Sequence, residues 1–259
     1  MNTEIKNAIQ AADSEAQYDE SAKRLLAQKY VLAHILVRTV EEFQGMEIEK
    51  VVSLIEGDPY ISKIPVASGL TNKDRNEEGK RIVGLNTEAG ERNEGLVRFD
   101  IIFYVRMRNG LAQMIINVEA QKDEPGSYQI LNRAIFYVSR LISSQKERDF
   151  VKSNYNDIKT VYSIWVCMNM PENSMCHIHL TREDLLGKHN WKGNLNLVNI
   201  VMIGLTNALP ESHNEYVLHR LLCAMFSNEL SQQQKMKIME QEYHIPMEQN
   251  FKEEVSIMC

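Results

Sequence analysis

The sequence predicts an α/β protein in which helices cover both faces of a mixed central β-sheet and a helical appendage follows at the C-terminus. Residues 98–121 alternate as one long β-hairpin would, with apolar and β-branched side chains at every second position. Residues 160–167 and 195–205 are continuous apolar runs rich in Val and Ile, typical of strands buried on both faces. We therefore expect one α/β domain over residues 1–205 and a C-terminal helical extension over residues 206–259 that packs on it.

The composition excludes several classes of protein. At 259 residues the chain is long enough to bury a full core, and 44% hydrophobic with 25% charged residues excludes a disordered or fibrous chain. No apolar run reaches the length that spans a bilayer, and the first residues lack the features of a signal peptide, so we expect a cytoplasmic protein with no membrane partner. The four cysteines have neither CxxC nor zinc-ribbon spacing, which favours free thiols. The net charge of −6 argues against nucleic-acid binding through a global positive field, although a local basic stripe stays compatible with it.

The predicted hairpin brings two carboxylates together. Asn109 and Gly110 tolerate the positive φ angles of a two-residue type I′ turn, and this turn fixes the register of the two strands. In that register Asp100 lies directly opposite Glu119, with Cβ atoms about 5 Å apart on one face. The other face is expected to point into the core and consists of Phe99, Ile101, Phe103, Val105, Ala112, Met114, Ile116 and Val118.

Like charges directly opposite each other destabilise a strand pair unless something compensates for them. A divalent cation with oxygen ligands would do so, which makes Asp100 and Glu119 candidate metal ligands. Gln121 lies two residues beyond Glu119 and therefore shares its face. The alternative is that twist or a β-bulge shifts the register, leaving two separate, solvated carboxylates.

These motifs resemble a known family. The pattern RFDI, a hairpin and VEAQ, followed by an amphipathic helix with Arg133 and Tyr137, resembles the PD-(D/E)XK nuclease superfamily. Within it, the chain is most similar to the Rpn-like recombination-promoting nucleases, also labelled PD-(D/E)XK family transposases. The segments YDESAKRLL at residues 18–26 and YNDIKTVYSIWV at residues 155–166 resemble the opening helix and a later strand of that family. The resemblance covers roughly the first four-fifths of the chain, thinning towards its end.

The resemblance implies a restriction-endonuclease-like fold and a magnesium-dependent DNA endonuclease, with a link to recombination or mobile elements and with manganese as an alternative ion. Asp100, Glu119 and the carbonyl of Ala120 would hold the metal, and Gln121 would orient the attacking water. Other branches of the superfamily carry Lys where this chain has Gln121. That departure leaves open an inert nucleic-acid-binding or regulatory protein that retains the nuclease fold. A third possible function is transposition by a DDE-type enzyme. No third suitably placed acidic residue on a strand supports it.

Four further residues are candidate accessory groups. The family resemblance implies that Asp19 and Lys23 of the opening helix lie near the site, although Asp19 is equally suited to be a helix N-cap. Glu94 precedes the hairpin and either approaches the metal or is an exposed loop acid. Lys122 is adjacent to Gln121, but on a regular strand it points to the other face.

The helix expected after the hairpin, ending near Ser144, carries two stripes. Gln129, Arg133, Tyr137 and Arg140 recur at helical spacing and could bind DNA phosphates, or form a solvated face. The stripe expected in the core consists of Leu131, Ala134, Ile135, Val138, Leu141 and Ile142.

The remaining segments are expected to build the scaffold. Helices are predicted over residues 19–43, 46–56, 210–230 and 231–243, and a strand over residues 81–85. The charged segment 71–81 is expected to be a solvated loop, and His177 with His179 an exposed face of a strand. The C-terminal helices are expected to offer a surface for a homo-oligomer or another partner.

Overall fold

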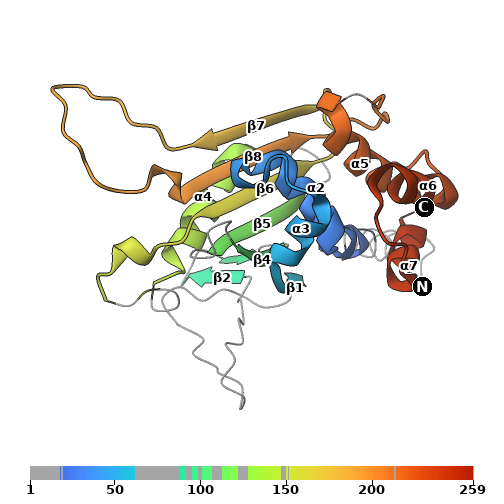
Figure 1. The fold of residues 1–259 in the computed structure, drawn as a ribbon, viewed down its shortest axis with the longest axis horizontal. Helices are drawn as coiled ribbons and strands as arrows, with labels where there is room; N and C mark the ends of the chain where they lie inside the picture. Colours follow the sequence, from blue (N-terminus) through green and yellow to red (C-terminus); the bar gives the residue numbers. More distant parts are fainter. Residues whose placement is uncertain are drawn as a thin grey trace, which may run out of the picture.

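The protein is built around a six-stranded mixed sheet with the strand order β1-β4-β5-β6-β8-β7 (Figure 1). The computed structural model describes residues 18, 20–61, 88–91, 95–98, 101–106, 113–121, 128–146, 150, 152–212 and 214–258. The six strands are β1 (Ile55–Ile61), β4 (Ile101–Arg106), β5 (Gln113–Gln121), β6 (Val161–Cys167), β7 (Ser174–His179) and β8 (Val198–Gly204). Strands β5, β6 and β8 are mutually parallel, whereas β1, β4 and β7 join antiparallel to their neighbours. The predicted mixed α/β sheet is thereby confirmed.

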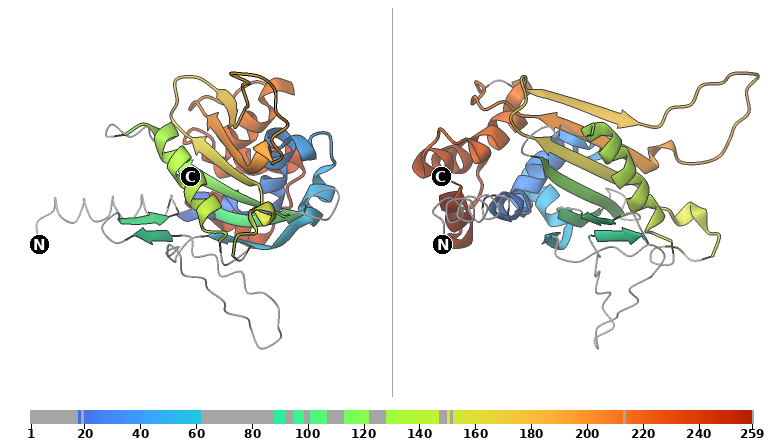
Figure 2. Two further views of the ribbon diagram at one scale, coloured as in Figure 1. Left: turned by 90° about the vertical axis from the view of Figure 1, so that its left-hand side faces the viewer. Right: turned by 180° about the vertical axis from the view of Figure 1, so that it is seen from behind.

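Helices pack on both faces of this sheet (Figure 2). On one face, Ile101, Phe103 and Val105 of β4 join an apolar cluster with α2 (Lys29–Thr39) and α5 (Val217–Phe226). On the other face, Ile102 and Tyr104 pack with α4 (Ile130–Ser143). The prediction that Ile101, Phe103 and Val105 face the core is confirmed, since all three are buried.

The N-terminal helical region is interrupted, contrary to the single helix predicted over residues 19–43. A helical segment over residues 20–26 ends before Gln28, whose extended backbone at φ −65° and ψ 129° allows α2 to begin at Lys29. After α2 the chain forms the 3₁₀ turn η1 (Glu41–Phe43). Leu25, Leu26 and Phe43 are all buried, so the apolar spacing that predicted one helix serves three packed pieces instead.

The next segment also differs from the prediction. Helix α3 (Ile48–Leu54) ends at Leu54, and Ile55 begins strand β1, whereas the sequence predicted helix through residue 56. Gly57, Asp58 and Pro59 lie inside β1 at an irregularity in its pairing with β4. An edge strand tolerates Pro because its outer N–H positions do not take part in the ladder.

A second, two-stranded sheet pairs β2 (Glu88–Glu91) with β3 (Gly95–Arg98). Arg98 is therefore paired with Glu88 rather than belonging to the β4–β5 hairpin, which is shorter than predicted at its start. Glu88 and Glu91 are the first and last residues of β2. The turn at residues 109–110 and the segments 71–81 and 81–85 lie outside the described residues.

The C-terminal region forms three helices, α5, α6 (Gln232–Tyr243) and α7 (Gln249–Ile257), after the 3₁₀ turn η4 (Asn214–Tyr216). The helix predicted over residues 210–230 is thus shorter, at Val217–Phe226, and α7 was not predicted. Phe251 and Val255 of α7 belong to the same apolar cluster as the sheet.

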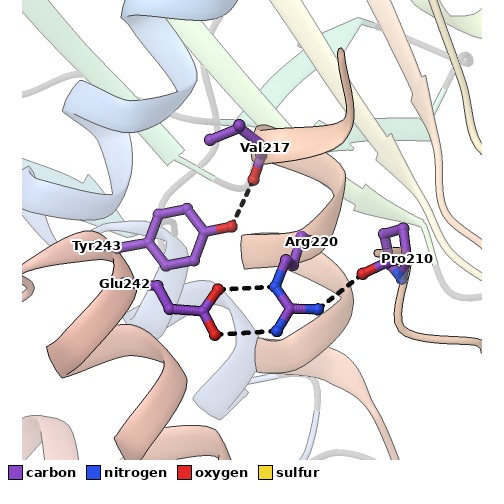
Figure 3. Close-up of polar contacts among 5 residues, drawn as sticks. All are labelled: Pro210, Val217, Arg220, Glu242 and Tyr243. Carbon is purple, nitrogen blue, oxygen red and sulfur yellow. Dashed lines mark hydrogen bonds and ion pairs between the residues drawn. The ribbon is translucent and has the colours of Figure 1, made fainter. Parts of the chain in front are cut away.

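Side-chain contacts fasten α5 to α6 (Figure 3). Arg220 donates two hydrogen bonds to the Glu242 carboxylate, at 2.7 and 2.9 Å, and a third to the Pro210 carbonyl at 2.7 Å. The Tyr243 hydroxyl donates to the Val217 carbonyl at 2.8 Å. These bonds join the two helices and the preceding loop into one unit.

Candidate active site

The predicted site residues fall into two groups. Asp19, Glu94, Asp100 and Lys122 lie outside the described residues. The backbone of Glu119, Ala120 and Gln121 forms the C-terminal end of β5, and the side chains of Lys23, Arg133, Tyr137 and Arg140 are described in full.

The register of the β4–β5 ladder is the one predicted from the turn. Ile101 is paired with Val118, and the pairing continues regularly through six pairs to Arg106 with Gln113. The register slip weighed as an alternative is therefore absent from the described part of the ladder. The pair of Asp100 with Glu119 would be the next in this register, and it lies beyond the described pairs.

The end of β5 lies in the interior of the sheet, between β4 and β6. Glu119 is paired with Trp165 and Gln121 with Cys167 in the parallel β5–β6 ladder. Trp165 and Cys167 belong to the apolar cluster under α4. Because paired positions in a ladder share a face, positions 119 and 121 belong to the face of the sheet that α4 covers.

An arginine surrounded by aromatic rings lies on that face. The guanidinium carbon of Arg133, in the first turn of α4, lies 4.8 Å from the ring centroid of Tyr137, 5.4 Å from that of Trp165 and 5.8 Å from that of Tyr128. Its two terminal nitrogens donate to the hydroxyls of Tyr128 at 2.8 Å and Tyr137 at 2.7 Å. Stacking and hydrogen bonds together fix the plane of the guanidinium.

The sequence predicted Arg133 and Tyr137 for this site but missed Tyr128 and Trp165. Placing Trp165 beside Arg133 requires the β5–β6 register, and placing Tyr128 there requires the position at which α4 begins. The i, i+5 spacing of Tyr128 and Arg133 is no helical neighbour relation, because Tyr128 precedes the helix.

The helical stripe predicted to bind phosphates is only partly exposed. Tyr137 is 6% exposed and packs in the core, with its ring 5.4 Å from that of Trp165. Arg140 is half-buried and lies 5.9 Å from the Phe136 ring. Conversely, Leu131 and Ile135 were predicted to be core residues and are exposed. Compared with the predicted core stripe, the buried face of α4 is rotated towards Tyr137, because Arg133, Tyr137 and Trp165 pack together between the helix and the sheet.

Lys23 does not share this face. Its helical segment packs through Ala22, Leu25 and Leu26 into the cluster that contains α2, on the opposite side of the sheet from α4. His177 and His179 lie on β7, both exposed as predicted, with ring centroids 4.9 Å apart. The His177 Nε2 lies 2.9 Å from Asn199 Oδ1, and its ring stacks on Tyr162.

The polar groups described on this face are the Arg133 guanidinium and the hydroxyls of Tyr128 and Tyr137 that it contacts. Within the described residues there is no group of three or more His, Cys, Asp or Glu that could hold a metal ion. The predicted carboxylate pair includes Asp100, which lies outside the described residues. On the other face of the sheet, burial raises the pKa of the Cys223 thiol on α5 to about 11, which disfavours thiol chemistry there.

Comparison of the chain with family models, curated proteins and solved structures finds no match. No helix in the described part of the chain is long and apolar enough to cross a membrane.

Proposed function

We propose that this protein is a magnesium-dependent endonuclease that hydrolyses DNA phosphodiester bonds at the end of β5. The observation that carries the proposal is the β4–β5 register, which runs regularly up to the pair before Asp100 and Glu119. Continuing the ladder by one pair would place the two carboxylates opposite each other, as a shared cation requires. The proposed function also rests on the resemblance of RFDI, VEAQ and the following helix to PD-(D/E)XK nucleases.

The donor set suits Mg²⁺. Two carboxylates and the carbonyl of Ala120 are hard oxygen ligands, and such ligands are typical of Mg²⁺ and Mn²⁺ sites. When bound, the ion would polarise the phosphate and lower the pKa of an attacking water. In this chain, Asp100 and Glu119 would hold and orient the ion.

Gln121 would position the water. The amide can accept one hydrogen bond and donate two, so it can orient a nucleophile. It cannot take a proton at neutral pH or offset the developing charge as an ammonium would, and turnover should therefore be modest.

Arg133 would bind a phosphate oxygen of the DNA. Its guanidinium lies on the same face as positions 119 and 121 and is already held by Tyr128 and Tyr137. An arginine fixed in this way needs little reorganisation to contact a phosphate. Arg140, two turns further along α4, is a second candidate phosphate ligand.

The second candidate function is an inert nucleic-acid-binding or regulatory protein. The amide of Gln121 favours it, because the superfamily's catalytic ammonium is missing. The pair of carboxylates opposes it, because an inert binder gains nothing from two acids beside a phosphate. The proposed link to recombination or mobile elements rests on the resemblance alone.

A plasmid-nicking assay separates the two functions. Supercoiled DNA is incubated with the full chain and Mg²⁺, Mn²⁺ or EDTA, beside Asp100→Ala, Glu119→Ala and the matched control Glu240→Gln, which removes an exposed acid on α6. The nuclease should nick DNA with either metal, and only the two site variants should lose this activity. If no protein cuts but the parent retains DNA in a gel shift, the inert binder replaces the nuclease.

Metal linkage gives an independent test. Two facing carboxylates repel each other when the metal is absent, so Mg²⁺ or Mn²⁺ should raise the melting temperature of the parent. Asp100→Asn should remove this response, and Glu240→Gln should keep it. A melting temperature that ignores both ions in the parent would argue against the metal site.

A further inference from the structure

The two outer strands of the main sheet differ in how their outer edges are protected. Strand β1 is irregular between Glu56 and Tyr60, where Gly57 has φ +60° and is followed by Asp58 and Pro59. A bulge, a charge and a proline are the devices by which proteins prevent a sheet edge from pairing with another chain. The β1 edge is therefore closed to further strands.

Strand β7, at the opposite edge, has none of these devices. It pairs with β8 without irregularity, from Ser174 with Gly204 to His179 with Asn199. Its sequence, SMCHIH, contains neither proline nor an acidic or basic residue other than histidine. Five of its six residues are exposed, and Ile178 is partly buried. In the part of the chain that the structure describes, no strand lies on its outer side.

The segment that follows β7 carries apolar side chains into solvent. We name residues 180–197, which connect β7 to β8, the arm; it projects away from the body of the protein (Figure 1). Leu185 is 88% exposed, Leu186 98% and Trp191 75%. Six of the thirteen exposed large hydrophobic residues of the described chain, Met175, Leu180, Leu185, Leu186, Trp191 and Leu195, lie in β7 or the arm. Exposed apolar side chains gathered in this way mark an interaction surface.

We propose that β7 and the arm form the interface between two copies of this chain. The β7 strands would pair antiparallel across a two-fold axis and join the two sheets into one. Because the strands run in opposite directions, the arm beyond the end of one β7 would lie beside the start of the other. There the second copy presents Tyr216, whose ring lies 5.7 Å from that of His219, and His219 in turn contacts the Ser174 carbonyl at 3.0 Å.

A second copy fits this surface better than nucleic acid does. The outer edge of a strand presents backbone N–H and C=O groups at strand spacing, and an extended peptide matches them whereas a phosphodiester chain does not. The positive charge of the arm is also partly neutralised, since Arg182 pairs with Asp184 at 3.2 Å and Glu183 lies between them.

Self-pairing also suits the charge and symmetry of the strand. The chain carries a net charge of −6, yet β7 contributes no acidic residue, so two copies can meet there without repulsion between carboxylates. A two-fold contact uses the β7 edge of both copies, so neither copy keeps an unpaired β7 edge and the assembly stops at two chains. An edge that paired with an unrelated strand would gain no such closure.

The first test measures the mass of the full chain in solution by sedimentation equilibrium. The parent should have twice the mass of one chain. Cys176→Lys places an ammonium on each copy close to the two-fold axis and should shift the mass to that of one chain. Gln233→Lys adds the same charge to an exposed position on α6 and should leave the dimer intact, and circular dichroism should show both variants folded. A monomeric parent, or a Cys176→Lys variant that stays dimeric, would overturn the proposal.

The second test detects the interface in the parent chain itself. Cys176 is exposed whereas Cys167 and Cys223 are buried, so a short bis-maleimide should link two parent chains through Cys176. Cys176→Ser should abolish the linked dimer and Cys259→Ser should keep it. A dimeric parent that is not linked through Cys176 would place its interface elsewhere and overturn the proposal.

The third test addresses the arm. A Leu185→Ser, Leu186→Ser double variant should weaken self-association at least tenfold while DNA retention in a gel shift stays unchanged. If DNA retention falls and the mass does not, the arm serves nucleic acid, and its part in the dimer is refuted. None of these outcomes depends on nuclease activity, so the interface and the proposed function fail or succeed separately.

Discussion

Glu119 on β5 is paired with Trp165 on β6, and the Trp165 ring lies 5.4 Å from the guanidinium carbon of Arg133 on α4. The sheet register and the helix packing thereby bring the end of β5 and Arg133 to one face of the molecule. Arg133 and Trp165 follow Glu119 by 14 and 46 residues in the sequence, and the parallel β5–β6 ladder and the packing of α4 on the sheet bring these positions together.

Arg133→Lys tests whether this geometry serves the proposed nuclease. Lysine keeps the charge but loses the planar stacking and the two bonds to Tyr128 and Tyr137. Plasmid nicking should fall by about 10- to 100-fold, the scale on which misplaced binding groups act. Arg140→Lys, on the same helix, is the matched control and should change nicking less. If neither variant loses nicking, charge alone matters on α4, and equal losses in both would show that the stacking around Arg133 has no special role.

Gln121 is the residue that tests how the proposed nuclease works without an ammonium in its site. Gln121→Ala should lower nicking by about 10- to 1,000-fold while the thermal shift with Mg²⁺ persists, because the amide orients water and does not hold the metal. Gln121→Lys should keep or raise activity, since it places a cation at that position. If both variants cut like the parent while Glu119→Ala is inactive, the amide has no catalytic role.

The central strands were predictable because their signals are local. The uninterrupted apolar runs of residues 101–105 and of β6 each specify a strand, and a two-residue turn specifies the register. Six pairs of the β4–β5 ladder follow that register. Helix α4 was also predictable: it was expected to follow the hairpin and to end near Ser144, and its observed range is Ile130–Ser143.

The remaining features depend on tertiary contacts that the sequence does not show. The break at Gln28 contains neither glycine nor proline, so helical spacing continues through it. In β1, pairing with β4 overrides the turn tendency of Gly57 and Pro59. The buried face of α4 includes Tyr137 because its ring packs against Arg133 and Trp165. The spacing of apolar residues along the helix does not reveal such contacts.

The stability of the fold should fall in acid because of His34. Its Nε2 lies 3.0 Å from the Tyr243 carbonyl, and burial lowers the pKa of His34 below its ordinary 6.5. As the pH falls, the unfolded chain therefore binds a proton at His34 more readily than the folded chain does. The contribution of neutral His34 to the free energy of unfolding is complete above the ordinary pKa and is lost as the pH falls through the pKa of His34 in the folded chain. Melting temperatures between about pH 7 and pH 5 should show this slope, and His34→Gln should reduce it. His189→Gln, on the exposed arm, should leave the slope unchanged; a slope that persists in His34→Gln would assign it to another group.

Arg220 should stabilise the contact between α5 and α6 by its geometry more than by its charge. Arg220→Lys keeps the charge but cannot reach both Glu242 oxygens and the Pro210 carbonyl together. The pair is partly exposed, so the expected cost in unfolding free energy is modest, about 0.2–1 kcal/mol. Urea unfolding measures it, with Arg182→Lys on the arm as the matched control near zero. A control loss as large as that of Arg220→Lys would show that the bidentate bond adds nothing.

Lys235 should be the most sensitive charged residue of the C-terminal helices. Its side chain is fully buried at 0% exposure, and its ammonium donates to the Met258 carbonyl at 2.8 Å, at the C-terminal end of α7. A cation there compensates the helix dipole and satisfies an end carbonyl.

Lys235→Ala should cost about 2–5 kcal/mol of unfolding free energy, because it removes the buried stem as well as the charge. Lys235→Met keeps most of the volume and should fall between the alanine variant and the parent. Lys237→Ala, exposed on the same helix, should stay within about 0.5 kcal/mol of the parent. If Lys235→Met is as stable as the parent in urea, the stem alone stabilises the helix pair and the bond to Met258 contributes nothing.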